Sequence, residues 1–349
     1  MDKRYIYAGI FIGMLLVMAL ITVILLFTLL WNNKSVNGSK LVIDHDGGAD
    51  DAMAIFIALI HEEYFDGPQV VALTTTFGNV YEPQAFINTQ RILNIAQRRN
   101  IRIYRGSQTP FIDGIETDYY YGLDGLGDSC EAEYEPILPQ PDHAVHALLD
   151  LSIKHEGNLI IVAIGAMTNI ALAVKMDPLF ISRLSKLYVG AGFVEGPDHQ
   201  DAEFNAAMDP EAYYIVTKNA NPNKVMVVPF SQVYSSMNLT RKWRESTLGV
   251  IPTKMMEVQN CFERVSMSGN YTGWTQLDPA VMALALNDSL VEEIKYSNNS
   301  IILCGDKRSI NTNEFTSVSE ANVALLYSGN REHYQELLMN TFTAELDQT

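Results

Sequence analysis

From residue 40 onward the chain alternates short apolar runs with longer stretches in which apolar residues recur at helical spacing. The apolar runs lie at residues 40–43, 70–79, 101–106, 158–165, 186–192 and 224–230, and the helical patterns lie between them at 50–65, 82–99, 143–156, 168–176 and 210–220. Strands that alternate with helices are joined by right-handed crossovers and form a mostly parallel sheet. The pattern predicts an α/β fold, an open and mostly parallel sheet flanked by helices. The last third of the chain is harder to interpret, and helical insertions over the site are expected there.

The N-terminal segment is of a different kind. Residues 5–31 contain no charged side chain and are mostly apolar. At about 1.5 Å per residue this stretch is long enough to cross a hydrocarbon core of ~30 Å, and it exceeds the roughly 7–15 residues of a secretory apolar region. The sequence predicts a tail at 1–4, a transmembrane signal anchor at 5–31, a tether at 32–39 and one domain at 40–349. A cleaved signal is the alternative.

Charge and sequons bear on location and partners. Lysines and arginines lie on both sides of the predicted span, so they do not set its orientation. Six Asn-x-Ser/Thr sequons, at residues 33, 37, 238, 270, 287 and 298, favour a glycosylated domain on the extracellular or lumenal side of a single-pass membrane protein. The net charge of -17 excludes nucleic acid as a partner, because phosphate binding needs a basic face. Three cysteines leave one disulfide and one free thiol open.

Four aspartates fall within eight positions, directly after the first apolar run: Asp44, Asp46, Asp50 and Asp51. Like charges this close raise each other's pKa, so the carboxylates need a cation or hydrogen-bond donors. In open α/β sheets ligands bind beyond the carboxyl ends of the strands, which is where these residues fall. Hard cations such as Ca²⁺ bind carboxylate and carbonyl oxygens. The cluster predicts a divalent cation site.

Three other interpretations of the aspartates were weighed. A helix N-cap or first-turn role explains one or two of them but not all four. An EF-hand loop that began at Asp44 would need Glu at its twelfth position, where Ile55 stands. A phosphatase-type pair of Asp44 and Asp46 leaves Asp50 and Asp51 unexplained, although a phosphatase or other metal hydrolase stays an alternative.

The pattern D-x-D-x-G-x-D-D-A at residues 44–52 resembles the inosine–uridine-preferring nucleoside hydrolase family. Five further segments resemble blocks of that family and occur in the same order: TTTFGNV (74–80), YGLDGLGD (121–128), IGAMTNIALA (164–173), AEFNAAMDPEA (202–212) and LDPAVMALAL (277–286). Each segment alone is a weak signal, whereas their order is specific. The resemblance identifies a membrane-anchored member with a nucleoside hydrolase-like catalytic domain.

The resemblance implies calcium-dependent hydrolysis of the N-glycosidic bond of ribonucleosides to ribose and free base, as in nucleoside catabolism and purine salvage. It implies a Ca²⁺ site made by Asp46, Asp51, Asp278 and the backbone carbonyl of Ile164. Asp46 would also be the general base that activates a metal-bound water, and Asp44 would be a supporting carboxylate. The ribose hydroxyls would be held by Asp50, Asn79, Glu203 and Asn205. The substrate partner is a nucleoside, and a homo-oligomer stays open.

The chain departs from the family pattern at three positions. Leu277 stands where many members have a histidine that protonates the leaving base, Tyr121 where a histidine often precedes the Gly-rich loop, and Pro197 where an asparagine is common. Trp274 could stack on the base, with a packed aromatic as the alternative. The departures leave the base preference undetermined. They motivate a second hypothesis, a membrane-tethered nucleoside- or ribose-binding protein of the same fold with little turnover.

Overall fold

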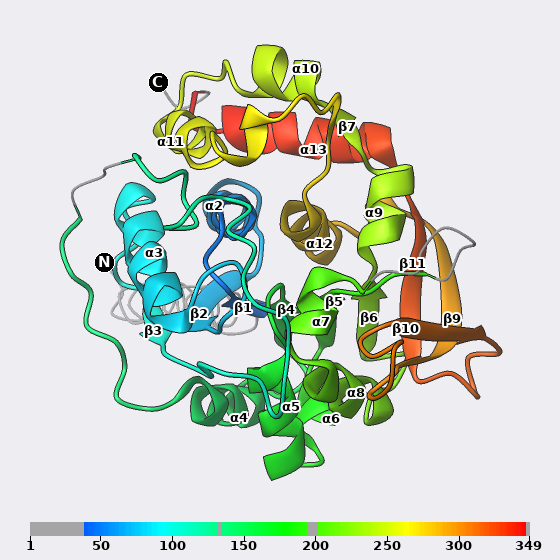
Figure 1. The fold of residues 1–349 in the computed structure, drawn as a ribbon. Helices are drawn as coiled ribbons and strands as arrows, with labels where there is room; N and C mark the ends of the chain where they lie inside the picture. The colour runs from blue at the N-terminus through cyan, green and yellow to red at the C-terminus, as the bar shows by residue number, and fades with distance from the viewer. Residues whose placement is uncertain (1–37, 131–133, 195–201, 347–349) are drawn as a thin grey trace, which may run out of the picture. The chain divides into compact units, whose positions relative to one another are not determined.

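The computed structural model describes residues 38–130, 134–194 and 202–346. In these residues the main sheet has nine strands in the order β10-β9-β11-β6-β5-β4-β1-β2-β3 (Figure 1). Along the chain they are β1 (Lys40–His45), β2 (Gln69–Thr75), β3 (Arg102–Tyr104), β4 (Leu159–Ala163), β5 (Lys186–Gly190), β6 (Val225–Val228), β9 (Val291–Ile301), β10 (Asn311–Phe315) and β11 (Val323–Gly329). Seven strands from β3 across to β11 are parallel, whereas β9 is antiparallel to β11 and to β10. The predicted open, mostly parallel sheet is confirmed.

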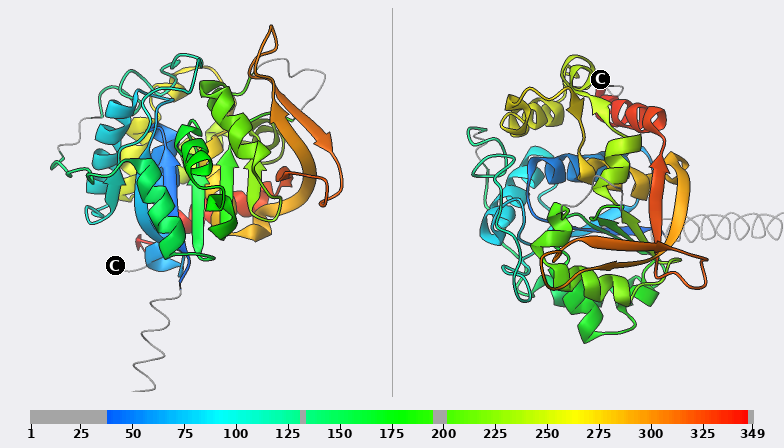
Figure 2. Two further views of the ribbon diagram at one scale, coloured as in Figure 1. Left: turned by 90° about the horizontal axis from the view of Figure 1, so that it is seen from below. Right: turned by 45° about the vertical axis from the view of Figure 1, so that its right-hand side comes forward.

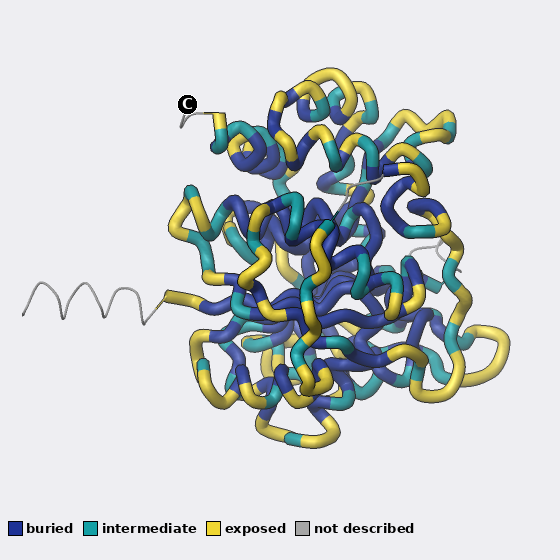
Figure 3. The backbone as a smooth tube through the Cα atoms, turned by 90° about the vertical axis from the view of Figure 1, so that its left-hand side faces the viewer, coloured by how far each residue is buried: buried dark blue, intermediate teal, exposed yellow. Residues whose placement is uncertain are grey.

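Strand β1 lies between β4 and β2 and is buried on both faces. Leu41 and Ile43 belong to the hydrophobic core on one side of the sheet, and Val42 belongs to the core on the other side. Because successive side chains of a strand point to opposite faces, a strand covered on both sides reads as one continuous apolar run. Figure 3 shows the buried backbone of this central region in dark blue.

Helices cover both faces of the sheet (Figures 1 and 2). One core includes residues of α2 (Ala49–Tyr64), α3 (Glu82–Ile95) and α12 (Leu277–Leu286), and the other includes residues of α4 (Ala144–Lys154), α5 (Thr168–Met176), α6 (Phe180–Arg183) and α8 (Pro210–Lys218). Helices α11 (Lys254–Phe262) and α13 (Arg331–Thr343) pack against α2 from outside. Because α2 has neighbours on nearly every side, it is apolar almost all round.

The last third of the chain contains the expected helical insertions but also widens the sheet. After β6 come α9 (Phe230–Ser236), α10 (Arg241–Trp243), the π-helical turn η1 (Arg244–Leu248) and a small antiparallel sheet of β7 (Leu239–Thr240) and β8 (Gly273–Trp274). Strands β9 and β10 then form a hairpin, coloured orange, that makes up one edge of the main sheet (Figure 2). Much of β9 is exposed and polar, so it lacks the apolar pattern that marks the central strands.

The prediction of a single-pass membrane location is contradicted. Within residues 38–130, 134–194 and 202–346, no helix is long and apolar enough to cross a membrane. The longest helix described, α2, has 16 residues, fewer than the roughly 20 that a membrane span needs. The predicted span at 5–31 lies outside the described residues, so the anchor and the orientation drawn from it have no support in this structure.

A disulfide joins Cys130 to Cys261, and Cys304 is a free, exposed thiol. This is the arrangement of one bridge and one thiol that the cysteine count left open. The bridge ties the end of the Gly-rich loop to α11. Residues 40–349 group into one compact unit, and the finer segment boundaries predicted at residues 4, 31 and 39 stay predictions.

Candidate active site

The turn between β1 and α2 carries the aspartate cluster. Asp44 is the second-last residue of strand β1, and Asp46 directly follows the strand. Asp50 and Asp51 belong to the first turn of α2. Gly47 has a φ of +81°, and a Cβ there would lie 2.6 Å from the Cα of Ala85. Only glycine fits this turn, which is why the chain can pass so closely beneath α3.

Asp51 holds the turn together. Its Oδ2 accepts a hydrogen bond from the backbone N–H of Gly48 at 2.7 Å, and its Oδ1 accepts one from the backbone N–H of Asp46 at 3.2 Å. The first-turn role weighed for this residue is therefore real, because the carboxylate satisfies N–H groups that the helix leaves unpaired. It does not explain why two more carboxylates lie beside it.

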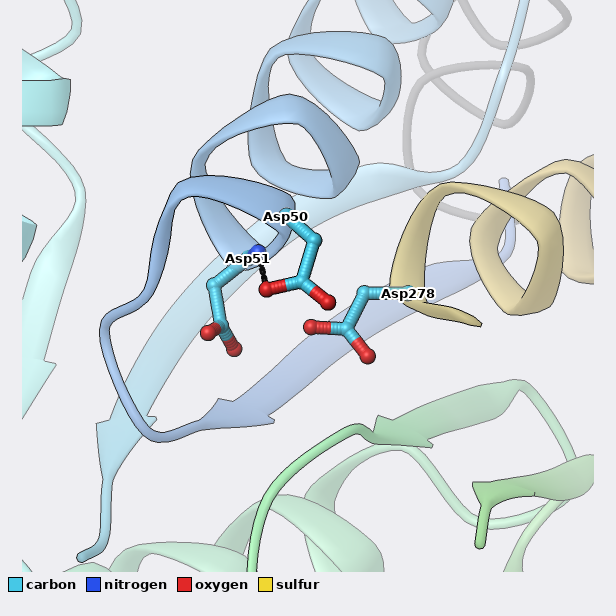
Figure 4. A group of neighbouring side chains, drawn as sticks. All are labelled: Asp50, Asp51 and Asp278. Carbon is cyan, nitrogen blue, oxygen red and sulfur yellow. Dashed lines mark hydrogen bonds between the residues drawn. The ribbon is translucent and has the colours of Figure 1, made fainter. Parts of the chain in front are cut away.

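Asp278, in the first turn of α12, completes a group of three carboxylates with Asp50 and Asp51 (Figure 4). Each offers one oxygen, and these oxygens lie within 4.8 Å of one another. Burial and the neighbouring negative charges raise the pKa of Asp50 to about 7, and they raise the pKa of Asp51 and of Asp278 well above the usual range. A cation among the oxygens would remove that repulsion.

Asp46 is not a member of this group of three carboxylates and is fully buried. Its Oδ2 accepts a hydrogen bond from the backbone N–H of Asn79 at 2.9 Å, and its Oδ1 has no partner among the described residues. Burial raises its pKa to about 6, although the hydrogen bonds lower it in part. The predicted ligand set of Asp46, Asp51 and Asp278 thus shares two members with the carboxylate group, and Asp50 is the third member in the structure.

Asp44 is fully buried, and two side chains hold one of its carboxylate oxygens. Its Oδ1 accepts hydrogen bonds from the Thr74 hydroxyl and from Asn169 Nδ2, the latter at 2.8 Å. Burial nevertheless raises its pKa to about 7, and Asp46 adds to the shift. Thr74 and Asn169 were not singled out from the sequence. Both lie inside segments that carried the family resemblance, which was the only signal that could have found them.

Asn205 and Glu203 bind the backbone at the points where strands β4 and β5 end. Asn205 Nδ2 donates to the carbonyl of Ile164 at 3.2 Å and to the carbonyl of Gly190 at 2.9 Å. Glu203 is the N-cap of α7 (Phe204–Met208) and accepts three backbone N–H groups, of which that of Gly192 is the nearest at 2.7 Å. Burial raises the pKa of Glu203 despite those hydrogen bonds.

These groups surround a cavity of about 240 Å³. It is lined by Asp50, Asn79, Asp118, Tyr120, Tyr121, Ile164, Glu203, Phe204, Asn205, Phe230, Thr275, Gln276, Leu277 and Asp278. Six of the predicted site residues are in this lining, whereas Asp44, Asp46 and Asp51 are not. The sequence reasoning missed Tyr120, Phe230 and Gln276, because they lie outside the segments that carried the family resemblance.

Trp274 does not line this cavity. It belongs to the wall of a neighbouring cavity of about 390 Å³, and only 3% of its surface is exposed. Its indole N–H donates to Glu263 at 2.9 Å, and the guanidinium of Arg244 lies 5.7 Å from its ring centre. This is the packed aromatic that was weighed as the alternative, and base stacking by Trp274 stays a prediction without support from its packing.

The departures from the family pattern also have clear positions. Leu277 lines the cavity with an apolar side chain, and the Tyr121 hydroxyl donates a hydrogen bond to Gln276 Oε1. Pro197 lies outside the described residues. The three carboxylates are all present, and no histidine of the described residues lines the cavity.

A family model for the inosine-uridine preferring nucleoside hydrolases matches residues 41–336. The chain belongs to this family. The match covers the main sheet apart from Lys40, its first residue, and every carboxylate described above. The predicted family is confirmed, whereas a membrane-anchored form of it is not shown.

Two curated members illustrate the relationship. The nucleoside hydrolase of Crithidia fasciculata, named inosine-uridine preferring, is 28% identical over 259 residues, which are 72% of this chain and 80% of the relative. Probable uridine nucleosidase 2 of Arabidopsis thaliana is 36% identical over 184 residues, 51% of this chain, and the match spans only about half of that relative, 55%. The names of these two members differ in the bases that they mention.

Solved nucleoside hydrolases share the fold. The plant nucleoside hydrolase PpNRh1 superposes with a TM-score of 0.77 at 27% identity, over 88% of this chain and 99% of that one. An inosine-guanosine nucleoside hydrolase superposes with a TM-score of 0.78 at 22% identity, which supports the fold alone. The relatives are named as hydrolases or nucleosidases, so the prediction of an N-glycosidase is confirmed for the family. A metal and a nucleoside substrate fit such a family, whereas the choice of calcium stays a prediction.

Proposed function

We propose that this protein hydrolyses the N-glycosidic bond of ribonucleosides and that it uses a divalent cation, of which Ca²⁺ fits best. The observation that carries the proposal is the meeting of three carboxylates, from α2 and α12, at a cavity lined by amide and carboxylate groups. Family membership supports the reaction class, and the residue roles below are proposals.

The side chains suit a hard cation. The converging groups offer carboxylate oxygens, and the described cluster includes neither cysteine nor histidine. Two buried oxygens beside it, Asp46 Oδ1 and Asn79 Oδ1, have no hydrogen-bond partner in the described residues. Such unpaired oxygens are costly unless a ligand satisfies them. Asp46, Asp51 and Asp278, with Asp50 and the carbonyl of Ile164 nearby, would hold the ion.

A bound divalent cation would supply positive charge that orients a water molecule and makes it more acidic. Asp46 is then the group that accepts the proton. One of its oxygens is fixed by the backbone N–H of Asn79, and the other has no hydrogen-bond partner among the described residues. With a pKa of about 6, the carboxylate is ionised at neutral pH. Because this pKa lies close to neutral pH, the carboxylate can act as a general base.

The sugar is held by hydroxyl contacts. Asp50, Asn79, Glu203 and Asn205 line the cavity and present acceptors and donors of the kind that a polyol needs. Cleavage of a glycosidic bond passes through an oxocarbenium-like state, and contacts to the hydroxyls that strengthen there lower the barrier. Glu203 already accepts three backbone N–H groups, so its carboxylate is fixed in orientation before a sugar arrives.

The test is a ribose-release assay with the full chain. Purine and pyrimidine ribonucleosides are incubated with Ca²⁺, with a chelator, and with the Asp46→Asn variant. An Asp150→Asn variant, changed at an exposed aspartate of α4, is the matched control. Release that needs the cation and Asp46 would support the proposal. Activity that persists unchanged in the chelator would contradict the role of the metal.

A second function rests on Leu277. Since its side chain lines the cavity and cannot donate a proton, the protein could bind nucleosides with little turnover. Equilibrium binding of a nucleoside in Ca²⁺, without release of ribose by the wild type, would favour this binding function over the hydrolase.

A further inference from the structure

Two cavities meet at the site. The cavity of about 240 Å³ adjoins the larger cavity of about 390 Å³, and four residues line both: Tyr120, Phe230, Thr275 and Gln276. Further walls of the larger cavity include the aromatic and apolar side chains of Tyr234, Met267, Tyr271 and Trp274, and the polar residues Arg241, Ser266 and Thr272 lie outside the wall that the two cavities share. Aromatic and apolar surfaces of this kind accept a flat ring. With the ribose held by the groups proposed for it in the smaller cavity, the base of a nucleoside would face the shared wall.

The shared wall has few groups that can donate a hydrogen bond to the base. Leu277, which follows Gln276 in the chain, is apolar. The Thr275 hydroxyl already donates to Asn238 Oδ1 at 2.8 Å. Tyr120 is 48% exposed and packs edge-on against Tyr121, and no hydrogen bond within the described residues holds its hydroxyl in one orientation.

Gln276 is different because it is buried and oriented. Only 5% of its surface is exposed, and it is the N-cap residue of α12, two positions before Asp278. The Tyr121 hydroxyl donates a hydrogen bond to Gln276 Oε1. This contact orients the amide group and leaves Nε2, its donor nitrogen, on the side away from Tyr121. Nε2 makes no hydrogen bond within the described part of the chain, and the residue lines both cavities.

We propose that Gln276 Nε2 donates a hydrogen bond to the departing base, at the acceptor atom bonded to the carbon beside the glycosidic nitrogen, and that Tyr121 is the positioning residue that aims it. The acceptor is O2 in a pyrimidine and N3 in a purine. This inference rests on the proposed hydrolase function and names the group that assists the leaving base in a site that lacks an acid at Leu277.

The chemistry balances without an acid. The bond from the anomeric carbon to the base nitrogen breaks, and its electron pair stays on the base, which leaves as an anion. Gln276 stabilises that charge by a hydrogen bond and keeps its own proton, because an amide is too weak an acid to give it up. Water adds to the anomeric carbon, Asp46 takes the water's proton, and the base is protonated later from solvent. The turnover rate therefore rises with the acidity of the base.

The experiment compares three substrates that differ in leaving group: uridine, 5-fluorouridine and 4-nitrophenyl riboside, whose leaving group needs no assistance. We expect Gln276→Ala to lower kcat on uridine about 100-fold, as expected for the loss of one donor to developing negative charge. The loss shrinks on 5-fluorouridine and falls below about threefold on 4-nitrophenyl riboside. Tyr121→Phe shows the same ranking with smaller losses. Gln108→Ala, at an exposed glutamine, is the control and changes none of the rates.

Gln276→Glu keeps the shape of the side chain and removes the donor, so it serves as a second variant if Gln276→Ala does not fold. A negative charge there opposes an anionic leaving group, and uridine turnover falls further than in Gln276→Ala. An equal loss on all three substrates would show that Gln276 is only structural and would overturn this inference alone. A wild type that cleaves none of the three, 4-nitrophenyl riboside included, would overturn the hydrolase function and this inference with it.

Discussion

The two oxygens of Asp46 have different surroundings. Oδ2 is held by the backbone N–H of Asn79, while Oδ1 has no partner among the described residues. A carboxylate that is oriented by one oxygen and available through the other is suited to accept a proton from a substrate water. Burial raises the pKa of Asp46 to about 6, so the carboxylate is more basic than usual and is still ionised at neutral pH.

Asp46→Asn is expected to lower kcat by a factor of about 10²–10⁴, because the amide keeps the hydrogen bond from Asn79 but cannot take a proton. Nucleoside affinity should stay close to that of the wild type. Steady-state kinetics with a parallel binding titration measures both. A kcat within a few-fold of the wild type would assign the base to another residue.

Asp278→Asn is expected to weaken Ca²⁺ binding at least about tenfold, because a charged ligand is replaced by an uncharged side chain of the same shape. The metal-free protein should not become less stable, because removing the charge relieves repulsion with Asp50 and Asp51. Titration calorimetry gives the affinity and thermal unfolding gives the stability. An unchanged Ca²⁺ affinity would remove Asp278 from the ligand set.

The loops that follow β1 and β2 pass each other at glycines. A Cβ on Gly78 would lie 1.8 Å from Asp46 Oδ2, and a Cβ on Gly48 would lie 1.8 Å from Asn79 Oδ1. The backbones can approach closely only because neither residue has a side chain. The Asp46 carboxylate therefore owes its position to the loop of the neighbouring strand.

Gly78→Ala is expected to displace the Asp46 carboxylate and to lower kcat at least about 100-fold, since small misplacements of a reacting group have effects of this size. Gly38→Ala is the control, because a Cβ there meets no atom within 4 Å. Ribose release by both variants measures the effect. Wild-type kinetics in Gly78→Ala would show that the approach of the two loops does not position Asp46.

The disulfide acts between two elements, the Gly-rich loop and α11. Gln259, in the same helix, donates to the backbone carbonyl of Ala49 at 2.8 Å, next to Asp50. Breaking the bridge with Cys130→Ser and Cys261→Ser is expected to lower the free energy of unfolding by about 2–5 kcal/mol and the Tm by about 5 °C or more.

Cys304→Ser provides the control for the disulfide, because this exposed cysteine is free. Calorimetric scans of the double variant, the control and the wild type make the comparison. The role assigned to the bridge would be wrong if the double variant and the control had the same Tm.

The buried carboxylates make the stability of the whole protein depend on pH and on the cation. The folded-state pKa values of Asp44, Asp46 and Asp50, about 7, 6 and 7, lie above the ordinary value near 4. The folded protein therefore holds more protons than the unfolded chain in this range. Its stability is greatest below about pH 4 as far as these groups are concerned and is lost as the pH rises through about 6–7.

Without a cation, the Tm is accordingly expected to fall between about pH 5 and pH 8, and added Ca²⁺ should raise it more at the higher pH. The difference between the two Ca²⁺ effects should exceed about 3 °C, which corresponds to about 2 kcal/mol in a protein of this size. Thermal unfolding in chelator and in Ca²⁺ at both pH values measures it. Equal Ca²⁺ effects at the two pH values would show that the cation does not bind these carboxylates.

Much of the architecture followed from the sequence alone. The apolar runs and helical patterns from residue 40 to 230 predicted the strands and helices of the sheet's parallel part, because elements buried on both faces carry a strong periodic signal. The family followed from ordered short motifs. The polar strands β9 and β10 escaped notice, since exposed edge strands have no continuous apolar pattern. Residues 5–31 fitted a span by hydropathy, and no described helix supports a membrane location.

The site divides in the same way. The sequence placed Asp44, Asp46, Asp50 and Asp51 together because they are neighbours in the chain. The meeting with Asp278, the support of Asp44 by Asn169, the disulfide between Cys130 and Cys261, and the packing of Trp274 away from the carboxylates depend on contacts between distant segments. Local sequence fixes which chemical groups exist and which element carries them. Only the packing of helices and loops on the sheet decides which groups share one cavity, because that depends on every side chain between them.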